Sequence, residues 1–160
     1  MPPSRRYRIC ETPDPVLTVD VDADLNQEVV YLLIANKLQN YDCGKSRIVY
    51  IGRTERGVKR ISESAADKIA QALDHDFLKL KAYVIWCNPE EGEKASLPNM
   101  LERTILLRFE QIFGQLPLLN KRGFKLGDEG KYFTGNAIDK IIDRHSSTRR
   151  KVADELEKER

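Results

Sequence analysis

Two short apolar runs, separated by a segment rich in turn-forming residues, constrain the fold of this chain more than any other feature. The first run covers residues 29–34 and the second covers residues 48–52. β-branched and aromatic side chains at this density favour strands. Asn40, Asp42 and Gly44 between the runs favour a loop with turn chemistry. The pair therefore predicts an antiparallel hairpin with a long loop.

The residues that follow predict a small domain of mixed composition. Apolar side chains recur at helical spacing over residues 57–74, a third strand follows at 77–86, and a second helix covers 96–113. Gly114 supplies the end of that helix. We expect an α/β (α+β) fold with a small, mainly antiparallel, three-stranded central sheet flanked by helices.

The two ends of the chain differ from this middle part. Residues 1–26 carry four prolines and an acidic run. Beyond the middle part, a short helix is predicted at 136–144 and a charge-rich terminal helix at 147–160. We therefore expect an N-terminal extension (1–26), one domain (27–125) and a helical C-terminal extension (126–160).

The composition leaves nucleic-acid binding open and argues against several other classes. The chain has 27 basic and 25 acidic side chains, and a local basic face matters more than this near balance. Three widely spaced cysteines and two histidines form no cluster with zinc-ligand spacing. With no signal-peptide pattern and no apolar run of membrane-spanning length, we expect a cytoplasmic protein with reduced thiols and no membrane partner.

The end of the second strand brings an aromatic hydroxyl close to positive charge. Gly52 permits a sharp bend after Tyr50, and Arg53 follows at once. Arg60 comes ten residues after Tyr50, on the expected helix. A phenol at a strand end that faces a guanidinium on the next helix is one way to hold a phosphate. The alternative is a core strand followed by an exposed arginine.

Two polar residues in the second half of the domain have two interpretations each. Glu102 shares a helix face with Ile105 and Phe109, where a carboxylate costs desolvation unless Arg60, a lysine or a bound metal ion neutralises it. Alternatively, Glu102 lies exposed at the rim, favoured by the helix dipole. Asn120 ends an apolar stretch, either as a turn former or as a brace for an active-site group.

Taken in chain order, these features resemble the GIY-YIG nuclease family over about residues 27–125. Val29-Val30-Tyr31 stands where the family has its first tripeptide, with valine in place of glycine, and Tyr50-Ile51-Gly52 matches the second. Ser64 stands where several members carry histidine or tyrosine. After the second tripeptide, four individual residues match the family: Arg60, Glu102, Pro117 and Asn120.

The resemblance implies a metal-dependent DNA endonuclease that leaves 5′-phosphate and 3′-hydroxyl ends. It implies that Glu102 binds a divalent ion, Mg²⁺ or Mn²⁺, which prefers oxygen ligands. Arg60 would clamp phosphate oxygens, and Tyr50 or Tyr31 would orient or deprotonate the attacking water. Asn120 would hold the site through hydrogen bonds.

The expected partner is double-stranded DNA, and further basic residues would contact it. The expected substrate-binding residues are Gly52, Arg53, Lys45, Arg47, Arg56, Lys59, Lys121, Arg122 and Lys125. The nuclease hypothesis predicts that Tyr31, Tyr50, Arg60 and Glu102 line one cleft beside the sheet. The alternatives are a non-catalytic nucleic-acid-binding module on the same scaffold and an unrelated α/β interaction protein.

Overall fold

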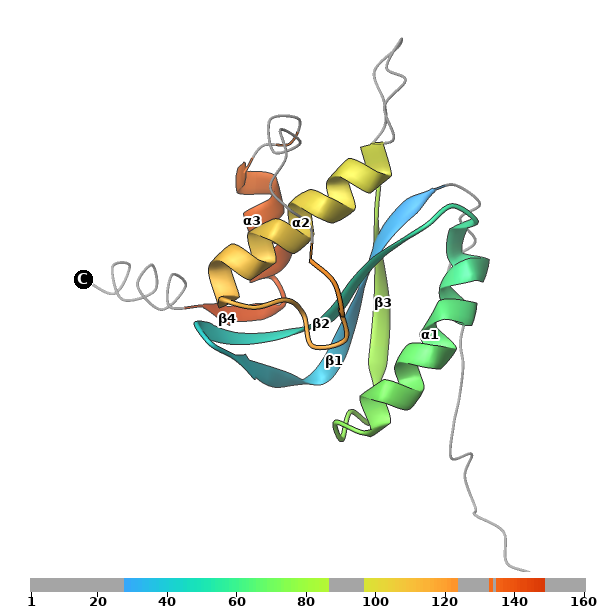
Figure 1. Cartoon of the computed structure of the whole chain (residues 1–160), viewed down its shortest axis with the longest axis horizontal. Coiled ribbons are helices and arrows are strands. Elements are labelled where there is room, and N and C mark those ends of the chain that lie inside the picture. The colour runs from blue at the N-terminus through green and yellow to red at the C-terminus, as the bar shows by residue number, and fades with distance from the viewer. Residues whose placement is uncertain (1–27, 87–96, 124–132, 134, 149–160) are drawn as a thin grey trace, which may run out of the picture.

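An antiparallel sheet forms the centre of the molecule (Figure 1). The structure is a computed structural model that describes residues 28–86, 97–123, 133 and 135–148. Within these residues the sheet has four strands in the order β3-β1-β2-β4, and every neighbouring pair is antiparallel. The strands are β1 (Val29–Tyr41), β2 (Gly44–Thr54), β3 (Leu80–Ile85) and β4 (Ser146–Thr148). The predicted α+β class is confirmed, and the predicted count of three strands is wrong.

The central hairpin is longer than the sequence suggested. β1 and β2 continue to Tyr41 and Gly44, so only two residues form the turn where we expected a long loop. Pairing is interrupted after Leu33 and again between Ile34 and Gln39. Such irregularities absorb unpaired residues and let a strand continue beyond its apolar part. The polar half of the hairpin was therefore not recognisable from hydrophobicity.

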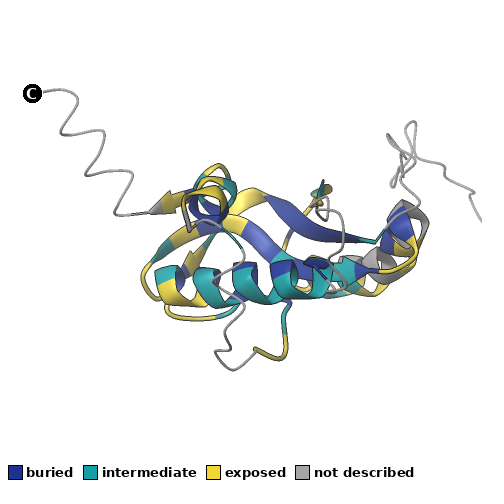
Figure 2. Cartoon of the chain, turned by 90° about the horizontal axis from the view of Figure 1, so that it is seen from above, coloured by how far each residue is buried: buried dark blue, intermediate teal, exposed yellow. Residues whose placement is uncertain are grey.

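Helices cover both faces of the sheet. α1 (Gly57–Leu73) packs on one face, which we call the α1 face. α2 (Leu97–Phe113) and α3 (Gly135–Asp143) pack on the other, the α2 face. Figure 2 shows buried residues concentrated in the strands and on the inner sides of the helices. The predicted order strand, strand, helix, strand, helix is confirmed.

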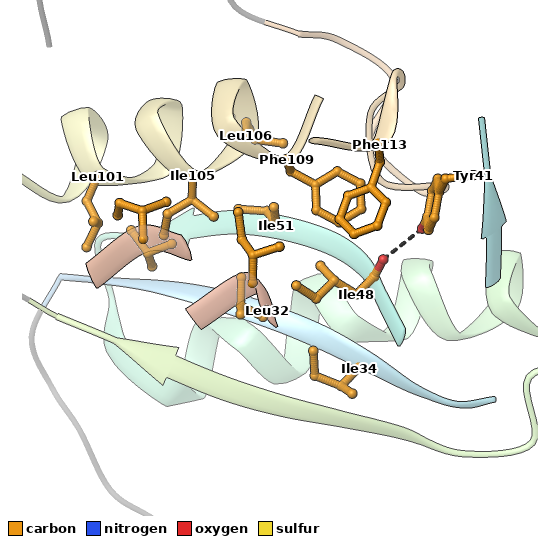
Figure 3. Packing of buried hydrophobic residues seen from close by; sticks show 13 residues of the cluster. Leu32, Ile34, Tyr41, Ile48, Ile51, Leu101, Ile105, Leu106, Phe109 and Phe113 are labelled. Atoms are coloured by element: carbon orange, nitrogen blue, oxygen red, sulfur yellow. Dashed lines mark hydrogen bonds between the residues drawn. The ribbon is translucent and has the colours of Figure 1, made fainter. Parts of the chain in front are cut away.

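The α2 face carries the larger apolar core (Figure 3). Alternate residues of β1 and β2 point into it, because successive side chains of a strand face opposite ways. They meet an apolar stripe of α2 that includes the rings of Phe109 and Phe113, which lie 4.4 Å apart between centroids and are tilted by 35°. The labelled residues of this core are Leu32, Ile34, Tyr41, Ile48, Ile51, Leu101, Ile105, Leu106, Phe109 and Phe113.

Two separate segments cover the outer edge of β2. β4 pairs with residues 44–46. Further along, the backbone N–H of Leu119 donates to the carbonyl of Val49 at 2.8 Å. Ser147 and Thr148 therefore belong to a strand, which corrects the helix predicted at 147–160; the rest of that range lies outside the described residues. Charge density favoured a helix there, but pairing with β2 decided the outcome.

Candidate functional site

Tyr31 and Tyr50 lie side by side on the α1 face. Tyr31 pairs across the hairpin with Gly52, and Tyr50 pairs with Leu33. The two rings are 5.7 Å apart between centroids and tilted by 44°. Tyr31 is only 2% exposed, whereas Tyr50 is partly exposed. Tyr50 is therefore the phenol that a ligand in solution can reach.

Gly52 gives the Tyr50 ring its position. A Cβ atom on Gly52 would lie 2.5 Å from Cε1 of Tyr50 and 2.9 Å from its hydroxyl oxygen. Real Cβ atoms do not approach other atoms so closely, so the ring occupies the space that any larger residue would need. The glycine of the Tyr50-Ile51-Gly52 tripeptide therefore makes room for the phenol, and no bend at this residue is required because β2 continues to Thr54.

Glu102 lies near the start of α2, with its side chain 16% exposed. Among the described residues it forms an ion pair with Arg53, whose Nε lies 3.8 Å from Oε2 of Glu102. Burial raises the pKa of Glu102, and Arg53 offsets this only in part. The carboxylate is thus neither exposed at the rim nor closely paired, which leaves it suited to a further positive group.

Arg53 is held by several carboxylates at once. It pairs closely with Glu28, donates to Glu55 at 3.1 Å and approaches Glu102 at 3.8 Å. Arg53 pairs across the hairpin with Val30, whose side chain packs in the α2-face core, so Arg53 also points to the α2 face. Arg53 is therefore engaged mainly by Glu28, and its availability to a substrate depends on release from that carboxylate.

Asn120 braces the backbone of β2 beside Tyr50. Its Oδ1 accepts from the N–H of Ile51 at 3.0 Å, and its Nδ2 donates to the carbonyl of Ile51 at 2.8 Å. This two-bond contact replaces the strand partner that Ile51 lacks on that edge. The side chain of Asn120 therefore holds the backbone of β2, and its role in bracing an active-site group stays a prediction.

The hydroxyl of Tyr41 fixes the approach of the chain to Asn120. It donates to the carbonyl of Ile48 at 2.7 Å and accepts from the N–H of Leu118 at 3.3 Å. The pKa of Tyr41 is raised to about 12, because the effect of burial exceeds the opposing effect of the hydrogen bond from Leu118. This role could not be predicted from the sequence, because Tyr41 falls in the part of the hairpin that lacks apolar periodicity.

Lys68 is a second residue that sequence reasoning missed. Its Nζ lies 4.8 Å from the centroid of the Tyr50 ring and donates to the carbonyl of Leu119 at 3.3 Å. Lysines on an amphipathic helix are usually solvated, so only the position of Tyr50 and Leu119 in space reveals this one. A cation therefore lies directly beside the partly exposed phenol of Tyr50.

The predicted site residues are brought together only in part. Tyr31, Tyr50 and Gly52 share the α1 face, and Glu102 belongs to the helix on the α2 face. Glu102 nevertheless acts on Tyr50, because its charge raises the pKa of that phenol. Arg60 lies on α1, half exposed, in a close ion pair with Glu63 one turn along.

The other predicted basic residues fall in different places. Lys45 and Arg47 are exposed at the hairpin end of β2 beside β4. Lys121 and Arg122 are exposed directly after Asn120. Arg56 is exposed just before α1, whereas the side chain of Lys59, and Lys125 altogether, lie outside the described residues. Lys121 and Arg122 are therefore the cations that follow the brace at Tyr50.

The chemistry of Tyr50 follows from its surroundings. Burial, the neighbouring Tyr31 and the charge of Glu102 together raise the pKa of Tyr50 above the ordinary value of a phenol. The hydroxyl therefore stays protonated at neutral pH and can donate a hydrogen bond to a water or to an anion.

Glu102 is the residue here that could hold a divalent metal ion. Among the described residues no group of three or more His, Cys, Asp or Glu side chains gathers as a metal site. Mg²⁺ keeps several waters and accepts one or two carboxylates together with substrate phosphates. A desolvated carboxylate with its cation 3.8 Å away fits that requirement.

In the part of the chain that the structure covers, no helix is long and apolar enough to cross a membrane. A comparison of the chain with family models, with curated proteins and with solved structures found no match.

Proposed function

We propose that this protein is a metal-dependent endonuclease that hydrolyses phosphodiester bonds in double-stranded DNA and leaves 5′-phosphate and 3′-hydroxyl ends. The proposal rests chiefly on one observation. A partly exposed phenol, Tyr50, interacts with a desolvated carboxylate, Glu102, and has a lysine ammonium over its ring. A carboxylate, a hydroxyl donor and cations are the groups that phosphoryl transfer requires.

The raised pKa of Tyr50 argues for a donor role. The protonated hydroxyl would orient the attacking water or hold a phosphate oxygen, because a phenol with a raised pKa already carries its proton near neutral pH and cannot take one from water. Tyr31, buried behind it, would fix the ring of Tyr50. Asn120 would keep β2 in place under both.

Arg60 and Glu102 would complete the reaction. Arg60 pairs with Glu63 on the surface of α1, and exposed ion pairs are weak, so the guanidinium can exchange Glu63 for a phosphate at little cost. Glu102 would hold Mg²⁺ or Mn²⁺. When bound there, the ion would supply charge stabilisation at the departing oxygen.

The test is cleavage of supercoiled plasmid with Mg²⁺ or Mn²⁺ by the wild type and by Glu102→Gln. We expect the substitution to lower the rate by about 10²–10³-fold, as for the loss of one group that stabilises the transition state. Glu110→Gln is the matched control, because Glu110 is an exposed glutamate on the same helix. Equal rates for the wild type and Glu102→Gln would contradict the assignment of Glu102.

The same variant has a stability readout that separates a functional carboxylate from a structural one. Because burial raises the pKa of Glu102, the ionised form destabilises the fold once the pH exceeds the unfolded value. Glu102→Gln should therefore keep or raise the melting temperature at pH 7 while losing activity. A large drop in melting temperature would mean that the carboxylate is structural.

A further inference from the structure

Two lysines from distant parts of the sequence lie in segments that come together beside Tyr50. Lys68 is on α1, with its ammonium over the Tyr50 ring and bonded to the carbonyl of Leu119. Lys121 follows Leu119 by two residues, and its charge acts on Lys68. Asn120, between Leu119 and Lys121, is anchored to Ile51 by two hydrogen bonds. The fold therefore brings the backbone next to Lys121 close to the ammonium group of Lys68.

Holding two like charges together costs free energy that nearby acidic groups do not remove. Burial and then the charge of Lys121 lower the pKa of Lys68, and Asp67 counters this only in part. An anion between the lysines would relieve the repulsion, and the Tyr50 hydroxyl beside them is a further donor. Both ammonium groups are strongly hydrated point charges that suit a phosphate.

We propose that Lys68 and Lys121 form a binding site for one backbone phosphate of DNA beside Tyr50. The site deepens the proposed function, on which it rests for the identity of the ligand. It differs from the phosphate clamp expected at Arg60, which is turned toward Glu63 in the structure. A strand held at Lys68 and Lys121 passes directly over the exposed phenol.

The test is binding of a fluorescent 20-base-pair duplex in EDTA, measured by anisotropy between about 50 and 200 mM salt, the range over which phosphate contacts change affinity most clearly. Lys68→Gln and Lys121→Gln should each weaken binding roughly tenfold and lower the magnitude of the salt slope by about 1. If both lysines hold the same phosphate, the double variant should lose less than the product of the two single losses.

The matched control is Lys37→Gln. Lys37 also places its ammonium over an aromatic ring, 5.3 Å from the centroid of Phe77. Lys37→Gln, which removes a similarly placed lysine outside the proposed site, should leave the affinity for the duplex and the salt slope unchanged. Lys121 is exposed and, among the described residues, makes no contact that its replacement would leave buried, so a loss shared by both variants is not explained by unfolding.

Plasmid cleavage, measured in parallel, separates this proposal from the proposed function. Cleavage by the wild type with unchanged duplex binding by both variants would overturn the phosphate site and leave the nuclease standing. Weakened binding by both variants with no cleavage by the wild type would do the opposite. A wild type that does not bind the duplex at 50 mM salt would overturn both.

Discussion

At the scale of single residues, Tyr50 and Gly52 act as a pair. The ring fills the space above the glycine, so the position of the phenol depends on the absence of a side chain two residues later. Sequence analysis singled out both residues, but it assigned to Gly52 a bend that the strand does not make. Hydrophobic pattern and turn preference predict the backbone conformation. They do not predict that the ring of Tyr50 leans along its own strand over Gly52.

Gly52→Ala should therefore displace the phenol. The new Cβ would lie 2.5 Å from Cε1 of Tyr50, so the ring must move. We expect a loss of stability of about 1–3 kcal/mol, as for overpacking, and a much larger fractional loss of cleavage. Thermal melting and plasmid cleavage measure the two effects. Gly123→Ala is the control, because a Cβ there makes contacts no closer than 3.4 Å. Full activity in Gly52→Ala would show that the phenol position is unimportant.

At the scale of elements, residues 117–120, which follow α2, take the place of a neighbouring strand along part of β2. Residues 117–120 bond to β2 through Leu119 and Asn120, and Tyr41 holds them from the hairpin. The match of Pro117 and Asn120 to a family pattern pointed to this segment. Its attachment to Tyr41 could not be predicted, because it depends on contacts 77 residues apart.

Tyr41→Phe should loosen this segment. The change removes the donor to Ile48 and the acceptor for Leu118, and leaving such groups unpaired costs about 1–3 kcal/mol. We expect faster hydrogen exchange at the amides of Leu119 and Ile51, together with slower cleavage. Tyr83→Phe, at an exposed tyrosine, is the control. Unchanged exchange at both amides would mean that Asn120 holds the segment without Tyr41.

At the scale of the whole molecule, the segment expected as a C-terminal extension contributes to the same core. Ile138 and Ile142 of α3 belong to the α2-face cluster. Arg108 of α2 donates to both carboxylate oxygens of Asp139, at 2.6 and 3.0 Å. The short apolar stripe of α3 was visible in the sequence. Its docking partner was not, because a stripe does not specify the surface that it covers.

Asp139→Asn should weaken that docking. Asp139 is buried, and charge-assisted bonds of this kind contribute about 1.5–3 kcal/mol. We expect a lower midpoint in urea unfolding with an unchanged slope, since the unfolded state is the same. Lys140→Gln, at an exposed position of the same helix, should leave the midpoint where it is. A shared midpoint for wild type and Asp139→Asn would show that the apolar contacts alone dock α3.

The pairing of β4 with β2 also determines when the sheet can be completed during synthesis. The hydroxyls of Ser46 and Ser146, 2.8 Å apart, are separated by 100 positions in the chain. At about 5–20 residues per second, a ribosome takes roughly 5–20 s to make that stretch. During this interval the hairpin end of β2 is an open strand edge, which other chains can pair with. Nascent chains of this protein should therefore need protection from aggregation until β4 emerges.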